Sequence, residues 1–328
     1  MDDRDLLIWR DFERDLTIAK RSPRTIQSHQ ETVQQLIDFT AGRWCSKGCE
    51  HQRHDRAPLD EMTKAHIQDY ILEVMARHSD QTALVRFSSL RKFFNWMVDD
   101  DAIEESPMRK MEAPKPERKI INVPAVEDVR KILAVCEPRT KPADFQARFN
   151  NLRDAAIIRL FVEPGSPRVN EMANIEVGYL DMRTDAVTFK GKGAKWRGLA
   201  FSNKTGKAVS RYLRIRPEHP LVVAARRTDP ASDGPPQAWL GWRGKPLAAS
   251  GIYQMMKRRC EEAGVAHIHP HALRHLATHL FYEKGGTEQE AMFLFGWDDP
   301  AMAHHYAKQL AGKRAMASSR RLGIGDDL

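Results

Sequence analysis

The chain has 328 residues, with 52 Lys and Arg against 44 Asp and Glu, so its formal charge at pH 7 is +8. This length favours two domains of ordinary size, and 41% hydrophobic with 29% charged residues excludes a disordered or collagen-like chain. No apolar run approaches the roughly 18 residues of a membrane-spanning helix, and the acidic start is unlike a signal peptide. We therefore expect a cytoplasmic protein, nucleoid-associated when bound to DNA, with no membrane partner.

The charge is divided unevenly along the chain. Residues 1–110 hold 17 basic and 20 acidic side chains, whereas residues 111–328 hold 35 and 24. Between these halves, residues 111–124 contain three prolines, which disfavour helix in the residues before them. The pattern predicts an N-terminal domain over 1–110, a linker over 111–124 and a positively charged C-terminal domain over 125–328.

The first half has helical periodicity throughout. Ser22 and Pro23 supply a hydroxyl cap and a proline at the start of its second helix. Apolar residues recur at the spacing of one helix face in four stretches, residues 2–18, 25–40, 63–77 and 80–98. The sequence thus predicts a four-helix N-terminal domain.

The second half alternates between helical and β-prone patterns. Helices are predicted over residues 126–136, 147–163, 250–263, 272–283, 287–295 and 299–310. Short β-prone segments surround a glycine-rich turn, at residues 179–180, 187–189 and 198–201. We expect a mainly α chain with a small antiparallel β element, whose C-terminal domain is α+β.

Basic and aromatic side chains gather in a few separated stretches of the second half. They include Arg168, Lys192, His271, Arg274 and Tyr306. Guanidinium groups can hold the non-bridging oxygens of a phosphodiester and stabilise the charge that builds on phosphorus. A tyrosine hydroxyl can then attack, while a lysine or histidine protonates the leaving oxygen. These residue types therefore suit phosphodiester attack by a protein hydroxyl.

Four strings carry these residues in one order: Arg168-x-x-Glu171, Gly191-Lys192-Gly193-x-Lys195-x-Arg197, His271-x-Leu273-Arg274-His275, and Gly296-Trp297 with Tyr306 nine positions later. Together they resemble the tyrosine recombinases, also called phage integrases. The resemblance covers nearly the whole chain, because residues 1–110 look like the family's SAM-like helical core-binding domain. It is closest to the simple two-domain type without an arm-binding domain.

The resemblance implies a role for each matching residue. Arg168 and Arg274 would grip the scissile phosphate, and Tyr306 would attack it to give a 3′-phosphotyrosyl bond. Lys192 would be the general acid toward the leaving 5′-hydroxyl. His271 would hydrogen-bond the phosphate and assist proton transfer.

Other positions match the family pattern less directly or depart from it. Trp297 occupies a position that holds histidine or tryptophan in the family and would position the phosphate, and Glu171 would be a supporting residue. The family usually has glycine two residues before the first arginine, where this chain has Ser166. His304 and His305 adjoin the proposed nucleophile; a solvated helix face is the favoured position for both, and an approach of His305 to the site is the alternative.

The resemblance also implies cofactors and partners. A phosphotyrosyl bond conserves the energy of the phosphodiester, so neither ATP nor an obligatory metal is expected, in keeping with a sequence that has no P-loop motif. The expected partners are double-stranded DNA core sites, a homotetramer on two such sites that forms a Holliday junction, and an accessory DNA-bending protein. A catalytically silent DNA-binding protein and a type IB topoisomerase remain alternatives.

Other basic residues are candidates for DNA contact. The predicted set is Lys20, Arg21, Arg24, Arg86, Arg91 and Lys92 in the first half, with Lys195 and Arg197 near the glycine-rich turn. Residues 307–328 form a C-terminal tail, in which Leu310 and Met316 are candidate contacts with a neighbouring protomer.

A last constellation is Cys45, Cys49, His51 and His54, which lies between two predicted helices. Two thiolates and two imidazoles would suit tetrahedral zinc, but the spacing is compressed compared with ordinary zinc fingers. A flexible polar loop is the favoured alternative. Four cysteines in so long a chain do not predict a disulfide framework.

Overall fold

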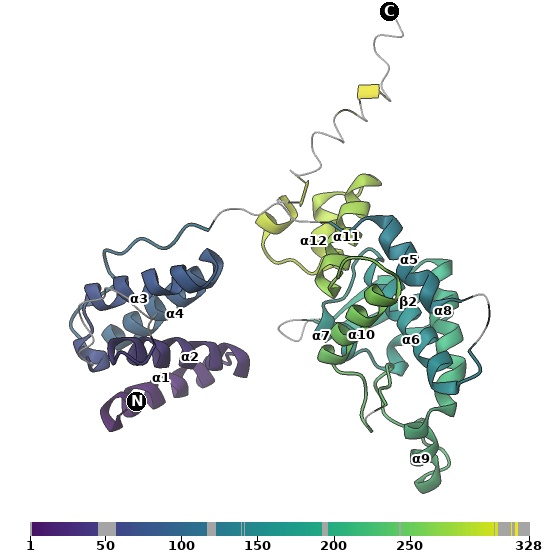
Figure 1. The fold of residues 1–328 in the computed structure, drawn as a ribbon, viewed down its shortest axis with the longest axis horizontal. Helices are drawn as coiled ribbons and strands as arrows, with labels where there is room; N and C mark the ends of the chain where they lie inside the picture. Colours follow the sequence, from purple (N-terminus) through teal and green to yellow (C-terminus); the bar gives the residue numbers. More distant parts are fainter. Residues whose placement is uncertain are drawn as a thin grey trace, which may run out of the picture. The chain divides into compact units, whose positions relative to one another are not determined.

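The computed structural model describes residues 2–44, 57–116, 123–138, 140, 142–191, 196–242, 244–304, 306–307, 316 and 319–320. The chain divides into two compact units, Met1–Ile120 and Ile121–Leu328, each with its own hydrophobic core. The expected mainly helical fold with one small antiparallel sheet is confirmed (Figure 1). In the described part of the chain, no helix combines the length and apolarity needed to cross a membrane.

The first unit contains the four predicted helices. They are α1 (Asp3–Ile18), α2 (Pro23–Thr40), α3 (Lys64–Arg77) and α4 (Asp80–Asp99), with a 3-10 turn at Leu59–Glu61. Each α-helix begins after a residue whose side chain accepts a backbone N–H of the first turn, namely Asp2, Ser22, Thr63 and Ser79. The core is aromatic, with the rings of Phe12 and Phe93 edge to face at 5.2 Å.

The second unit is built around one buried helix. Its helices are α5 (Val126–Cys136), α6 (Phe145–Phe161), α7 (Val169–Ala173), α8 (Asn203–Ile215), α9 (Pro220–Thr228), α10 (Ala249–Glu262), α11 (Pro270–Glu283) and α12 (Glu288–Phe295). Helix α6 contacts α5, α8 and α11. Its fully buried Asp154 accepts hydrogen bonds from Arg153 and from Arg259 of α10, both at 2.9 Å, which fixes α10 against α6.

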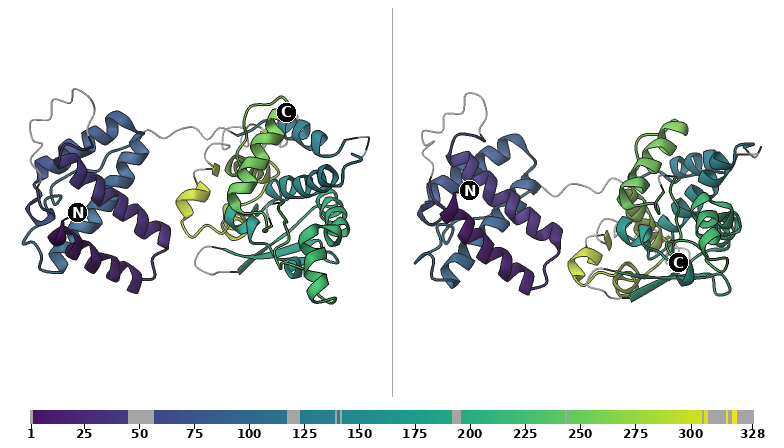
Figure 2. Two further views of the ribbon diagram at one scale, coloured as in Figure 1. Left: turned by 60° about the horizontal axis from the view of Figure 1, so that its bottom comes forward. Right: turned by 90° about the horizontal axis from the view of Figure 1, so that it is seen from below.

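The sheet has three short antiparallel strands in the order β1 (Leu180–Asp181), β2 (Ala186–Lys190) and β3 (Trp196–Ala200). Val187 lies opposite Leu199, and both side chains are buried, so one sheet face joins the core. The sheet lies at one edge of the helical body (Figure 2). The string that begins at Gly191 lies between β2 and β3 in the sequence, and its residues 192–195 lie outside the described part of the chain.

Helices α7, α8 and α9 were not predicted from the sequence. The start of α8 has no local side-chain cap. Instead, the carboxylate of Glu163, just after α6, accepts hydrogen bonds from the Ser202 backbone N–H at 3.0 Å, from the Ser202 hydroxyl at 2.6 Å and from Thr205. The cap is tertiary, so a scan of neighbouring residues does not detect it.

A buried histidine gives the second unit a pH-dependent stability. The His219 ring lies 4.7 Å from Phe149 and 4.5 Å from Trp242. Burial and the charges of Arg153 and Arg216 lower its pKa from 6.5 to about 4. Its Nδ1 accepts the Leu221 backbone N–H at 3.2 Å and caps α9.

We expect the free energy of unfolding to fall between pH 6.5 and pH 4, because there the unfolded chain binds a proton that folded His219 rejects. The stability is present above the unfolded pKa and declines as pH falls, by about 2–3 kcal/mol from this group. His219→Asn keeps an acceptor for the cap but does not titrate, so on acidification its free energy of unfolding should fall less than that of the wild type. Urea unfolding at pH 7.5 and 4.5 measures this; equal losses in both proteins would contradict it.

Candidate active site

Arg168 is the N-cap residue of α7, and its side chain is held by the helix it begins. Its backbone N–H donates to Glu171 Oε2 at 2.7 Å, and its Nη1 donates to Glu171 Oε1 at 2.9 Å. Its Nη2 donates to the Gly296 carbonyl at 3.1 Å, just after α12. The side chain is still 38% exposed, so the guanidinium can meet a ligand.

Glu171 also joins a second arginine. Arg197 of β3 donates one Nη2 hydrogen bond to the Glu171 carboxylate and donates through Nη1 to the carbonyls of Gly165 at 2.9 Å and Leu294 at 2.6 Å. Burial alone would raise the pKa of Glu171, but the Arg197 charge and the hydrogen bonds from both arginines hold it below its ordinary value. The carboxylate therefore stays ionised and connects α7, β3 and the end of α12.

Arg197 is engaged inside the fold. The Arg197 side chain is only 10% exposed and lies over the Phe189 ring, with its guanidinium carbon 4.5 Å from the ring centroid. The DNA contact that the sequence predicts for this residue stays a prediction. Its role in the structure is to hold Glu171.

Arg274 projects from α11 toward the same region. Its guanidinium is 3% exposed and donates to the carbonyls of Ser166 and Phe295. Burial, with the charges of Arg197 and Arg168, lowers its pKa to about 9, so the group remains protonated at neutral pH. The cations of Arg168, Arg197 and Arg274 thus lie close together. Their mutual repulsion is offset where a negatively charged group lies among them.

A cavity of about 530 Å³ lies beside these residues and brings together Arg168, Arg274 and His271. Its other lining residues are Pro167, Val169, Asn170, Glu171, Asn174, Lys190, Gly191, Tyr253 and Pro270. Desolvation at the cavity wall and the Arg274 charge lower the pKa of His271, although the residue as a whole is exposed, and an imidazole ring can accept or donate a hydrogen bond. The cavity offers cationic and neutral donors to an anionic group.

Tyr306 lies in a small apolar cluster at the end of the site. It is 5% exposed, and its ring stacks on Trp297 with centroids 5.3 Å apart and an interplanar angle of 6°. Burial raises the pKa of its hydroxyl to about 12, although the Arg274 charge opposes the shift. The hydroxyl hydrogen-bonds His275 Nδ1.

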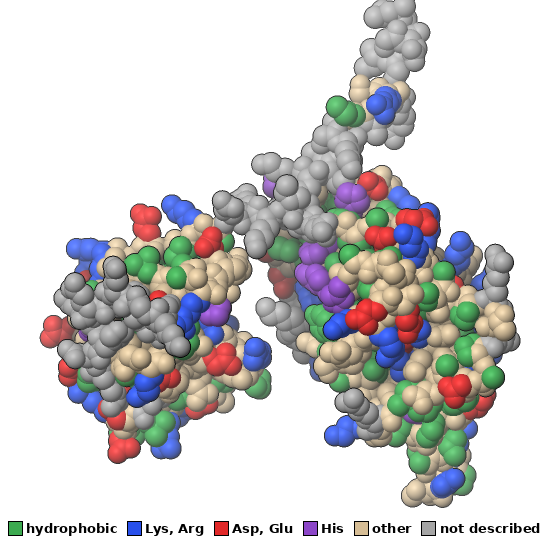
Figure 3. Space-filling model, viewed as in Figure 1, with side chains coloured by type: hydrophobic (Ala, Val, Ile, Leu, Met, Phe, Trp, Pro, Cys, Tyr) green, Lys and Arg blue, Asp and Glu red, His purple; other side chains and the backbone are tan. Residues whose placement is uncertain are grey.

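His275 is a residue to which the sequence analysis assigned no role. It follows Arg274 on α11 and lies one turn after His271, and the two imidazole rings meet edge to face at 4.3 Å. The i and i+4 spacing places both rings on one side of the helix, a signal that the sequence contains. Histidine side chains gather on this face of the second unit (Figure 3).

Several predicted residues lie outside the part of the chain that the structure describes. They are Lys192, Lys195, His305 and the four residues of the candidate zinc loop, Cys45, Cys49, His51 and His54. His304 is described; its Nδ1 lies 3.8 Å from Glu288, and its side chain is 70% exposed.

In the first unit, two of the predicted DNA contacts are engaged inside the domain. Arg86 donates to the Thr32 hydroxyl at 2.7 Å and is 16% exposed, so it braces α4 against α2. Arg91 donates to the Met111 carbonyl and lies 4.6 Å from the Phe87 ring centroid. It holds the segment that follows α4.

The remaining basic candidates of this unit lie at the surface between α1, α2 and α4. Lys20, Arg21 and Arg24 are exposed. Desolvation and the charge of Arg21 lower the pKa of Lys92, which indicates that these two cations lie close together. We call Arg21 and Lys92 the basic pair of the first unit.

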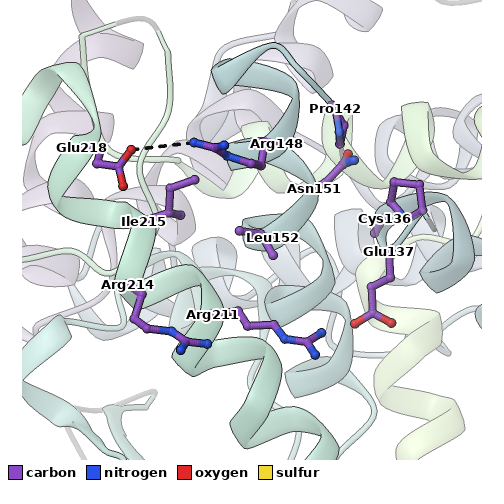
Figure 4. Close-up of a pocket in the computed structure, with 11 residues that line it drawn as sticks. Cys136, Glu137, Pro142, Arg148, Asn151, Leu152, Arg211, Arg214, Ile215 and Glu218 are labelled. Carbon is purple, nitrogen blue, oxygen red and sulfur yellow. Dashed lines mark ion pairs between the residues drawn. The ribbon is translucent and has the colours of Figure 1, made fainter. Parts of the chain in front are cut away.

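A second cavity, of about 550 Å³, lies between α6 and α8. Figure 4 shows Arg148 of α6 together with Arg211 and Arg214 of α8 around it. Arg148 Nη2 lies 3.8 Å from Glu218. None of the residues predicted for the site lines this cavity.

Two family profiles match the chain. Residues 125–312 match the Phage integrase family, and residues 8–104 match the N-terminal SAM-like domain of phage integrases. The first match alone covers more than half of the chain.

Curated relatives include tyrosine recombinases named XerC. The protein from Bacillus subtilis (strain 168) is 30% identical over 207 residues, which are 62% of this chain and 63% of the relative. The protein from Ralstonia pickettii (strain 12J) is 27% identical over 289 residues, covering 84% and 79%. The chain thus spans a little under two thirds of the length of the first curated relatives it matches.

Solved structures share the fold at low sequence identity. A Tn1549 transposon integrase in complex with a circular intermediate DNA has a TM-score of 0.68 and 15% identity, covering 96% of this chain and 99% of that one. The XerH site-specific recombinase bound to a palindromic difH substrate also has a TM-score of 0.68 and 15% identity, covering 90% and 79%.

The bond between Arg197 and Glu171 should be a main support of the site. Arg197→Ala leaves the buried carboxylate without its closest cation, and we expect a loss of about 3 kcal/mol in the free energy of unfolding of the second unit. Arg183→Ala is the matched control, because Arg183 is 93% exposed beside Asp181 and should change stability very little. Urea unfolding measures both; equal stabilities would contradict this assignment.

Proposed function

The chain belongs to the phage integrase family, and on this premise we propose that it is a site-specific recombinase that cleaves and rejoins DNA through a 3′-phosphotyrosyl intermediate. One observation carries the proposal. Arg168, His271 and Arg274 line a single cavity, and Tyr306 lies beside the same helix, hydrogen-bonded to His275.

The two arginines would bind the scissile phosphate. A guanidinium has five N–H donors, and Arg274 uses its Nη1 and Nη2 groups on the carbonyls of Ser166 and Phe295 while its charge remains in the site. Arg168 is held by Glu171 and is partly exposed. Fixed donors of this kind stabilise the charge that develops on the phosphate oxygens in the transition state.

Tyr306 would be the nucleophile. Its oxygen forms a bond to phosphorus as the bond from phosphorus to the 5′-oxygen breaks, which leaves a 3′-phosphotyrosyl group and a 5′-hydroxyl. Lys192, and His271 beside the phosphate, would supply the proton that the leaving 5′-oxygen needs. Trp297 would hold the nucleophile by stacking on its ring.

The reverse reaction completes strand exchange. The 5′-hydroxyl of another strand attacks the phosphotyrosyl group, so the phosphodiester is rebuilt without ATP or a metal. Two rounds on paired sites would pass through a Holliday junction, and we propose a homotetramer on two core sites of double-stranded DNA. A protein that relaxes supercoiled DNA without tetramer assembly would fit the type IB alternative instead.

The first unit would bind the DNA near the cleavage site. Arg21 and Lys92 form the basic pair, with Lys20 and Arg24 exposed nearby in the sequence. Most such contacts reach phosphates and confer affinity more than sequence preference. The unit can bind DNA in spite of its net negative charge because binding depends on where its cations lie.

Covalent capture tests the nucleophile. A pool of random-sequence duplexes with a nick on one strand is incubated with the protein, and covalent adducts are recovered after denaturation. We expect recoverable adducts with the wild type and none with Tyr306→Phe, because the substitution removes only the attacking oxygen. Tyr179→Phe is the control, since Tyr179 is 39% exposed and does not line the cavity, and it should retain adduct formation. Duplex binding without adducts in the wild type would support the silent alternative.

Salt titration tests the first unit. The double variant Arg21→Ala and Lys92→Ala should lower affinity for the captured duplex about tenfold at moderate salt and reduce the slope of log affinity against log salt by about 2. The control Arg109→Ala removes an exposed arginine that lies 2.9 Å from Glu105. Equal affinities and slopes in all three proteins would contradict the proposed contact.

A further inference from the structure

His275 contacts the atom that would react. Its Nδ1 hydrogen-bonds the Tyr306 hydroxyl, and the two ring centroids are 5.5 Å apart. The side chain is half-buried, and it is placed by α11, the same helix that carries Arg274. The contact therefore joins the proposed nucleophile to the helix that would bind the phosphate.

The phenol needs a proton acceptor at this position. Burial raises the pKa of Tyr306 to about 12, so only about one molecule in 10⁵ carries a phenolate at pH 7. Attack by the neutral phenol would leave a proton on the bridging oxygen of the new phosphotyrosyl bond. A base in contact with that oxygen removes the proton as the bond forms.

The two histidines of α11 face different groups. His271 lines the cavity with Arg168 and Arg274, where the phosphate would lie. His275 contacts Tyr306, and the edge-to-face contact at 4.3 Å fixes the two rings relative to each other. This division assigns His271 to the phosphate and His275 to the nucleophile.

We propose that His275 is the general base of the cleavage step, an inference that rests on the proposed function. As the Tyr306 oxygen bonds to phosphorus, its proton passes to His275 Nδ1, while the departing 5′-oxygen takes a proton from the general acid. In this step Nδ1 of His275 is the acceptor and Nε2 carries the ring proton, so the ring becomes an imidazolium. On religation it returns the proton to Tyr306, so the protein ends unchanged.

The charges around His275 are compatible with this role. Among the residues that the structure describes, His271 of the same helix and Tyr306 of the segment after α12 contact His275, and the Arg274 charge acts on Tyr306. The Arg274 cation opposes a second positive charge beside Tyr306. A bound phosphate diester brings negative charge to the same place and offsets that repulsion.

Substitution by asparagine distinguishes two functions of His275, which are to accept a hydrogen bond from Tyr306 and to take its proton. The asparagine Oδ1 stands where Nδ1 stands in histidine, so His275→Asn keeps an acceptor for the Tyr306 hydroxyl but takes no proton. We expect its single-turnover cleavage of a captured duplex to slow by about 100-fold or more, with unchanged DNA affinity and thermal unfolding. The matched control is His279→Asn, one turn later, where the histidine Nε2 lies 3.0 Å from Glu283.

A sulfur-substituted substrate distinguishes the base from the acid. If the 5′-bridging oxygen is replaced by sulfur, the leaving thiolate departs without protonation. This substrate should restore cleavage by Lys192→Ala, which lacks the proposed general acid. It should not restore His275→Asn, because the nucleophile still has to lose its proton.

Three outcomes would overturn the proposal. His275→Asn could cleave at the wild-type rate, sulfur could restore its activity, or His275→Ala could cleave faster than the wild type, as expected if the histidine restrains Tyr306 at rest. If the wild type itself forms no adduct with either substrate, the proposed function fails, and this inference fails with it. If the wild type cleaves, a failed test of His275 contradicts only the general-base role and leaves the proposed function in place.

Discussion

The carboxylate of Glu171 holds the site together. It receives the backbone and side chain of Arg168 from α7 and the guanidinium of Arg197 from β3. Because Arg197 also donates to the carbonyl of Leu294 in α12, three elements that are distant in the sequence meet at one ion group. A buried carboxylate of this kind neutralises part of the cationic charge before any phosphate arrives.

The close approach of these elements depends on one glycine. Gly296 ends α12 with φ +59°, and a Cβ there would lie 3.1 Å from the Arg197 side chain. Its carbonyl accepts a hydrogen bond from Arg168. A larger residue would be strained and would also displace the arginine that holds Glu171.

The helices of the first unit and the hairpin of the second followed from periodicity and local caps. The start of α8 did not, because its cap is Glu163, 39 residues earlier. In the same way, only the resemblance to a family indicated that Arg168, His271 and Arg274 belong to one site. The structure then showed that all three line one cavity. The contact between His275 and Tyr306 is tertiary and could not be predicted from spacing alone.

Part of the positive charge in the second half is buried inside the fold. The second half carries the positive excess, but four arginines in its described part are buried: Arg153, Arg216, Arg259 and Arg274. Arg153 and Arg259 neutralise Asp154, and Arg216 donates to backbone carbonyls. Part of the positive charge therefore stabilises the fold, and net charge overstates the basic surface available to DNA.

The most direct test of the account is to locate the covalent bond itself. The wild-type adduct is digested with nuclease and trypsin, and the peptides are sequenced by mass spectrometry. We expect a nucleotide remnant on Tyr306, within the tryptic peptide that spans residues 285–308. A remnant on any other residue would contradict it.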